Sequence, residues 1–71
     1  MSVTLNHTII WCADRYKSAD FFADIYGLPT PRDVFRFRVV EVANGVSLDF
    51  AEREGPIAPQ HYAFLVSEPE F

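Results

Sequence analysis

The chain has 71 residues, 49% of them hydrophobic and 15% aromatic, so it forms at most one domain and is too apolar to remain disordered. Its formal net charge of −4 argues against nucleic acid or an anionic membrane surface as its partner. No apolar run approaches the roughly 20 residues of a membrane span, and no signal-peptide pattern opens the chain, so we expect a cytoplasmic protein.

The small size of the chain makes its stability marginal. Ordering a residue costs roughly 1.5 kcal/mol, and in so short a chain apolar burial barely offsets this cost. Cys12 is the single cysteine and cannot form an internal disulfide. We therefore expect a partner chain, a bound metal or further sequence to stabilise the fold.

The first two predicted elements are a strand and a helix. Residues 5–12 ("LNHTIIWC") are rich in β-branched and aromatic types, and both alternating sets are partly apolar, which predicts a strand covered on both faces. In the helix that follows, Asp14 can cap the start and apolar residues recur at helical spacing up to Tyr26. Gly27 and Pro29 then end the helix.

Three further segments predict a β-rich second half. Residues 29–35 ("PTPRDVF") form a loop or a short irregular edge strand, because their two prolines cannot donate hydrogen bonds to a ladder. Residues 35–42 alternate as a strand, Asn44-Gly45 is a strong hairpin signal, and residues 46–52 form the returning strand.

The last part of the chain repeats the beginning in outline. After a proline-containing connector at residues 53–59, residues 60–66 ("QHYAFLV") predict another strand, and Ser67 can cap a new helix. We therefore expect residues 1–54 to form a first module, and residues 55–71 to hold a connector, the first strand and the helix start of an incomplete second module. On this interpretation the chain is cut short after Phe71.

The order of these elements resembles the vicinal-oxygen-chelate superfamily, which includes glyoxalase I, bleomycin-resistance proteins and extradiol dioxygenases. The helix "SADFFADIYGL" is the most specific part, because Ser18, Phe21, Phe22 and Gly27-Leu28 match the superfamily signature with Phe22 in place of the usual tyrosine. The resemblance covers nearly the whole chain. It implies an α+β fold, a βαβββ module with a curved mixed sheet, paired with a second module or a second chain around a cleft.

The same resemblance implies a metal site. His7 falls where the first strand of module one carries a ligand, Asp49 falls where the last strand carries a carboxylate, and His61 falls where module two begins with its own histidine. Two histidines and one carboxylate suit Fe, Ni, Zn or Mn as a divalent metal, which polarises neighbouring substrate oxygens. Asp49 departs from the pattern, because glyoxalase-like members more often use the longer glutamate.

Each candidate also has a simpler interpretation. His7 can be a buried histidine whose partner is a backbone carbonyl or a neighbouring side chain, His61 a surface residue and Asp49 a solvent-facing strand carboxylate. An apolar pocket for an aromatic ligand is predicted from Trp11, Phe37 and Tyr62, although such residues often belong to a core.

Three other charged residues are candidates for chemistry. Arg36 and Arg38 can clamp an anion, but we favour the solvent face of an edge strand for both. Glu41 is a further candidate general base.

Two functions follow from these residues and the resemblance. The first is a metal-dependent lyase, isomerase or dioxygenase acting on a small substrate with vicinal oxygens. The alternative is a metal-free, bleomycin-resistance-like protein that binds and sequesters an apolar or aromatic drug. In either case we expect a homodimer, because two chains related by a two-fold axis reproduce the two-module arrangement.

Overall fold

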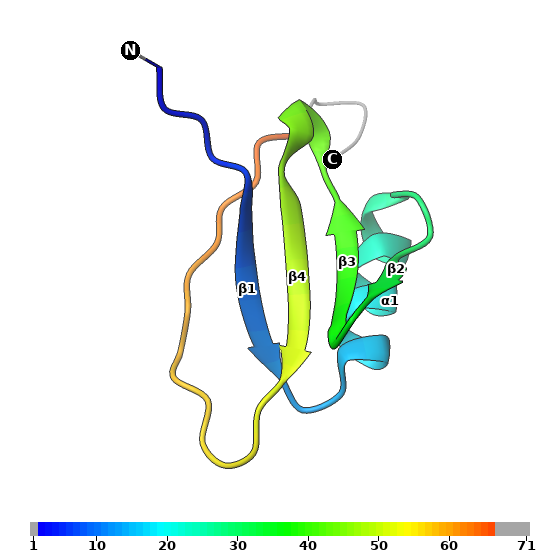
Figure 1. The fold of residues 1–71 in the computed structure, drawn as a ribbon. Coiled ribbons are helices and arrows are strands. Elements are labelled where there is room, and N and C mark those ends of the chain that lie inside the picture. The colour runs from blue at the N-terminus through cyan, green and yellow to red at the C-terminus, as the bar shows by residue number, and fades with distance from the viewer. Residues whose placement is uncertain (1, 67–71) are drawn as a thin grey trace.

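The structure, a computed structural model, describes residues 2–66 as one helix and one curved mixed sheet (Figure 1). The elements follow the order β1 (His7–Cys12), α1 (Arg15–Tyr26), β2 (Arg32–Val34), β3 (Phe37–Glu41), a 3₁₀ turn (Ala43–Gly45) and β4 (Ser47–Glu52). The strands lie in the order β1-β4-β3-β2, with β1 parallel to β4 and the other pairs antiparallel. The predicted βαβββ order is confirmed.

Helix α1 begins and ends where the local sequence places its caps. The Asp14 carboxylate accepts hydrogen bonds from the backbone N–H groups of Tyr16 and Lys17, at 3.0 and 3.1 Å, which satisfies two donors that the first turn leaves free. Gly27 adopts a left-handed conformation with φ of 64°, and the next amide, Leu28 N, donates to Ala23 O at 2.8 Å.

The hairpin between β3 and β4 is also formed as predicted. Asn44 and Gly45 both have positive φ, 66° and 71°, and Val42 N donates to Val46 O at 2.9 Å to close the turn. The hairpin pairs Glu41 with Ser47 and Val39 with Asp49.

A second hairpin shortens the strand that is predicted over residues 35–42. Phe35 has a φ of 56° and lies with Arg36 in a turn between β2 and β3, so β3 begins only at Phe37. A bulky aromatic residue rarely adopts this conformation. No local signal therefore indicates the turn, which is stabilised by the antiparallel pairing of Val34 with Phe37.

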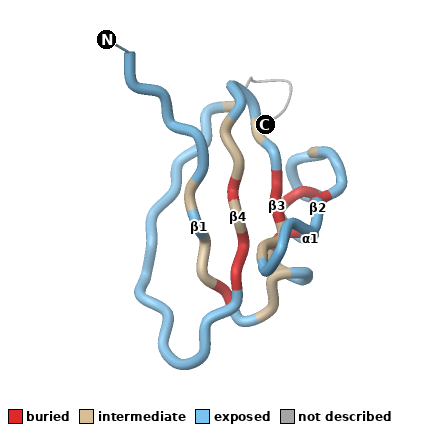
Figure 2. The backbone as a smooth tube through the Cα atoms, in the orientation of Figure 1, coloured by how far each residue is buried: buried red, intermediate tan, exposed pale blue. Residues whose placement is uncertain are grey.

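The core lies between α1 and one face of the sheet. It contains Cys12, Ala19, Ala23, Val40, Leu48 and Phe50. The two alanines are 0% and 4% exposed, and their small side chains let the helix approach the strands closely. Figure 2 shows the buried residues along β3, β4 and α1, whereas β1 is largely intermediate or exposed. Of the two covered faces predicted for the first strand, residues 2–66 cover the helix-facing side, whereas on the other side Ile9 is exposed and Trp11 is half-buried.

The strand predicted over residues 60–66 is not formed. We call residues 53–66 the tail segment; it leaves the end of β4 and returns toward the opposite end of the sheet without regular structure (Figure 1). Its Phe64 ring packs against the rings of Phe22 and Tyr26, with centroids 5.2 and 5.9 Å apart. An extended segment becomes a strand only when its backbone pairs with a neighbour, and the four-stranded sheet does not include this segment. The helix predicted at Ser67 lies outside the described residues.

Residues 2–66 contain no helix with the length and apolar character needed to span a bilayer.

Candidate functional site

The face of the sheet opposite α1 carries the candidate site. Side chains alternate along each strand, so the residues that pair in register with one another share this face. We call it the open face. Its members are His7, Ile9 and Trp11 on β1, Ser47, Asp49 and Ala51 on β4, Phe37, Val39 and Glu41 on β3, and Arg32 and Val34 on β2.

Polar side chains gather at one end of the open face. Register places His7 opposite Ser47, and Ser47 opposite Glu41, so three neighbouring strands contribute one polar row. Ser47 Oγ donates a hydrogen bond to Asp49 Oδ1 at 3.0 Å. Arg32 Nη2 donates to Glu41 Oε1 at 2.9 Å across the β2–β3 pair. We call this group, with the adjoining Asn6, the polar end.

The environment of His7 orients its imidazole. His7 is exposed, and its Nδ1 lies 2.6 Å from Asn6 Oδ1. A carboxamide oxygen only accepts hydrogen bonds, so Nδ1 carries the hydrogen of this contact. In the neutral imidazole the lone pair therefore lies on Nε2, where it is available to a proton or a metal. The interpretation of His7 as a buried core histidine is wrong.

Two of the three predicted metal ligands share one face of the sheet. His7 and Asp49 lie on paired strands and on the same face, two positions apart in register. His61 lies in the exposed tail segment. Among residues 2–66, no three His, Cys, Asp or Glu side chains are close enough to hold a metal ion. The metal site with all three ligands is thus not assembled within the described part of the chain.

Apolar side chains occupy the other end of the open face. Trp11 and Phe37 are both half-buried there, and Ile9 and Val39 lie between them and the polar end. Tyr62, the third predicted pocket residue, belongs to the tail segment rather than the sheet, and its hydroxyl donates to Gln60 Oε1 at 2.7 Å.

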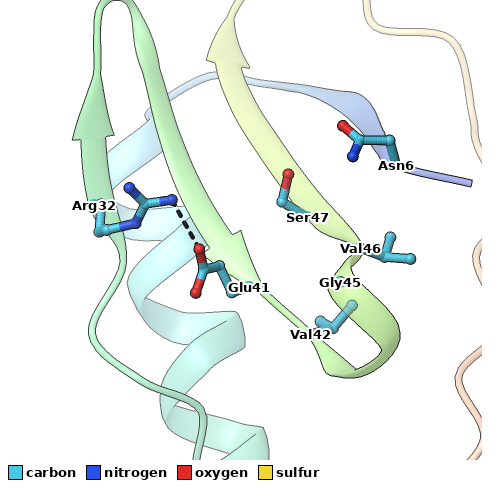
Figure 3. A pocket seen from close by; sticks show the side chains of 7 residues that line it. All are labelled: Asn6, Arg32, Glu41, Val42, Gly45, Val46 and Ser47. Carbon is cyan, nitrogen blue, oxygen red and sulfur yellow. Dashed lines mark hydrogen bonds and ion pairs between the residues drawn. The ribbon is translucent and has the colours of Figure 1, made fainter.

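A hollow of about 400 Å³ lies at the polar end, beside the β3–β4 turn (Figure 3). We call it the polar hollow. It is lined by Asn6, Arg32, Glu41, Val42, Gly45, Val46 and Ser47. Its volume falls in the range of about 300–1,000 Å³ that is usual for small-molecule sites. Sequence reasoning missed Asn6, Arg32 and Ser47 here, because only strand register places them around one hollow.

Arg38 has a structural role that the sequence did not indicate. It faces α1 rather than solvent, its side chain is 15% exposed, and it pairs with Asp20 on the helix and Asp33 on β2, each at 3.1 Å. Its guanidinium carbon also lies 5.1 Å from the centre of the Tyr16 ring. The prediction of a solvent-facing edge strand is wrong for Arg38, because β3 is an inner strand that α1 covers.

The solved structures that match this chain include two oxidases of high similarity. Oxidase ChaP-H1 is 55% identical with a TM-score of 0.92, and the match covers 97% of this chain and 56% of that one. Oxidase ChaP-H2 is 53% identical with a TM-score of 0.93, and the match covers 99% of this chain and 55% of that one. Both relatives are named oxidases.

The comparisons indicate the function only as a broad class. No family model matches the chain, and no curated protein does. The chain spans a little over half the length of the two oxidases it matches. The similarity fits an oxidative enzyme in broad terms.

Proposed function

We propose that this chain supplies one half of the substrate cleft of an enzyme that oxidises a small aromatic molecule. The observation that carries the proposal is the identity of 55% and 53% to two proteins named oxidases, over nearly all of this chain. The βαβββ order supports the further inference that the chain is a module of the vicinal-oxygen-chelate type.

The open face is the surface that binds the substrate in this proposal. Trp11 and Phe37 offer aromatic rings at one end, and Ile9, 36% exposed, extends the apolar floor toward the polar end. Flat apolar ligands gain most of their binding from such surfaces, and a few polar groups then orient them. This arrangement favours an aromatic ring that carries oxygen substituents directed toward His7 and Asp49.

The reaction class that we propose removes two electrons and two protons from a hydroquinone-type substrate. Molecular oxygen accepts both and becomes hydrogen peroxide, while the substrate becomes a quinone. In the metal-free form His7 Nε2 accepts the proton of a substrate hydroxyl, because the contact of Nδ1 with Asn6 places the lone pair of the neutral imidazole on Nε2. Withdrawing that proton raises the electron density of the ring and makes its oxidation easier. A bound metal would take the Nε2 lone pair instead.

A divalent metal (Fe, Ni, Zn or Mn) stays part of the proposal. Imidazole nitrogen and carboxylate oxygen are suitable donors, and His7 and Asp49 present one of each from paired strands. Further donors, with His61 as a candidate, have to come from the part that completes the cleft. A bound metal supplies Lewis acidity toward the substrate oxygens.

We also propose that a second module or a second copy of the chain covers the open face. The two oxidases are nearly twice as long as this chain, which leaves room for a second module in each of them. A homodimer provides the same arrangement when one chain holds a single module.

The alternative function is binding without turnover. The apolar floor formed by Ile9, Trp11 and Phe37 also suits a protein that sequesters an aromatic drug. The two functions share one surface and differ only in whether the bound molecule is oxidised.

Oxygen uptake distinguishes these functions. We expect the purified protein to consume oxygen with 1,4-dihydroxynaphthalene or catechol faster than a protein-free solution. His7→Gln should reduce this rate by about 100-fold, the usual contribution of a positioned base. Lys17→Gln, on the exposed side of α1, is the matched control and should leave the rate unchanged.

The same preparations test the metal by elemental analysis. Metal that is retained by the protein and lost in His7→Ala, Asp49→Ala and His61→Ala supports all three ligands. Tight binding of the aromatic probe, with oxygen uptake no faster than without protein, contradicts the oxidase proposal and favours the drug-binding alternative.

A further inference from the structure

The turn between β2 and β3 has a phenylalanine where the backbone favours glycine. Val34 pairs with Phe37, so Phe35 and Arg36 form a two-residue hairpin loop. Phe35 has a φ of 56°, whereas the φ of Arg36 is not positive. This sign pattern is that of a type II′ turn, whose first residue is usually glycine because a side chain strains the backbone there. All three glycines of the chain lie at positive φ, so phenylalanine at this position is an exception that needs a reason.

Packing within the fold does not supply that reason. Phe35 is 86% exposed, and a ring that stays in water adds little to stability. The described contact of its ring is with Arg36, whose guanidinium carbon lies 5.3 Å from the ring centroid. Strained residues that the fold does not need are concentrated at sites that bind ligands. The Phe35 ring is therefore a candidate for a contact outside the fold.

The strands on both sides of the turn are held firmly enough to maintain the strain. Arg38 on β3 pairs with Asp33 on β2 and with Asp20 on α1, each at 3.1 Å. These two pairs fix the hairpin to itself and to the helix. A strained residue persists only where the surrounding structure determines its conformation, and this network meets that condition.

The turn lies at the apolar end of the open face. Arg38 pairs with Phe50, so Phe37 lies beside Ala51, and Ala51 pairs with Trp11. The turn directly precedes Phe37 at the start of β3, at the same end of the sheet (Figure 1). An exposed ring in this turn extends the row of Trp11 and Phe37 beyond the last paired residues of the sheet.

We propose that Phe35 and Arg36 form a lip of the substrate site and bind the aromatic ring of the substrate by stacking. This inference rests on the proposed function, because it adds two residues to the same site. Arg36 lies over one side of the Phe35 ring, and the exposure of the ring leaves the remainder free for a ligand. Among residues 2–66 no carboxylate pairs with Arg36, so its N–H groups are available to substrate oxygens.

The variant Phe35→Gly separates the contact of the ring from its strain. Glycine adopts positive φ without the steric penalty, so we expect the variant to unfold at the same or a higher urea concentration than the parent protein. We expect its affinity for 2-naphthol, measured by calorimetry, to fall about fivefold, because one stacked aromatic contact is lost. A loss of affinity without a loss of stability identifies a binding role.

Three further variants serve as comparisons. Phe35→Tyr keeps the ring and should bind 2-naphthol within about twofold of the parent protein. Arg36→Gln removes the cation and should lower the affinity about threefold. The matched control, Phe21→Ala, removes a 67% exposed ring from α1 in the opposite layer and should leave the affinity unchanged.

Three results overturn the lip. The first is an affinity that Phe35→Gly does not change, or a parent protein that does not bind 2-naphthol. The second is a Phe35→Gly variant that unfolds at lower urea concentration, which assigns the ring to the fold. The third is a shift of Phe35→Gly toward monomer in analytical ultracentrifugation, which assigns the ring to an interface between copies of the chain.

The outcomes also separate the lip from the proposed function. Weaker binding by Phe35→Gly, in a protein that consumes no oxygen with aromatic diols, keeps the lip and rejects the oxidase. Oxygen uptake by the parent protein, with unchanged binding in Phe35→Gly, rejects the lip and keeps the oxidase.

Discussion

The thiol of Cys12 shows how burial controls a single reactive group. Cys12 is 8% exposed at the end of β1, and its Sγ donates a hydrogen bond to Ala51 O at 3.5 Å. Desolvation raises the pKa of this thiol, and the nearby carboxylates of Glu52 and Asp14 act in the same direction. The thiolate is the nucleophilic form, so the fold suppresses the reactivity of Cys12.

We therefore expect native Cys12 to react slowly with a disulfide reagent such as dithionitrobenzoate at neutral pH. The rate should keep rising with pH above the ordinary titration range of a thiol, because the raised pKa delays thiolate formation. The same protein in denaturant is the control and should react completely. Rapid labelling of the folded protein is the result that would contradict this prediction.

At the residue scale, the sequence indicated the chemistry of His7 and Asp49 but not their partners. Alternation along the strands is enough to place each residue on one of two faces. The Asn6 contact to His7 and the Ser47 contact to Asp49 depend on rotamers and register, which the sequence does not specify. Arg38 is the clearest case, because its partners Asp20 and Asp33 lie on two other elements.

At the scale of elements, the β3–β4 hairpin depends on one backbone conformation. Gly45 has a φ of 71°, and a side chain added there would meet nothing within 4 Å. A substitution at this position is therefore penalised by backbone strain and not by collision.

Gly45→Ala should lower the free energy of unfolding by about 1 kcal/mol, measured by urea denaturation. Gly45→Asn is the matched variant and should lose less, because asparagine tolerates the left-handed conformation better than alanine does. If both variants unfold at the same urea concentration as the parent protein, the left-handed backbone conformation of Gly45 does not affect stability, and the prediction is wrong.

At the scale of the whole molecule, the described sheet leaves two surfaces without a partner. β1 is an edge strand with one paired neighbour, and the open face exposes Ile9 and Val34, at 36% and 44%. Edge strands without proline or lysine readily pair with another strand. We expect the proposed homodimer to cover the open face.

We expect the 71-residue chain to sediment as a dimer in analytical ultracentrifugation. Ile9→Lys should shift it toward monomer, because the charge would be buried in the interface. Phe21→Lys alters a 67% exposed side chain on α1, in the opposite layer, and should leave the dimer intact. A monomer at every concentration rejects this assembly, and dissociation by Phe21→Lys instead places the interface on the helix.

The sequence by itself determined the features that depend on chain neighbours. The Asp14 and Gly27 caps of α1 and the Asn44-Gly45 turn were predicted because each satisfies backbone groups within a few residues. Only the tertiary structure decided the turn at Phe35, the irregular path of residues 60–66 and the placement of His7 and Asp49 on the same face of paired strands. Each of these depends on a hydrogen-bonded partner strand or its absence, and pairing between distant segments is not specified by local sequence.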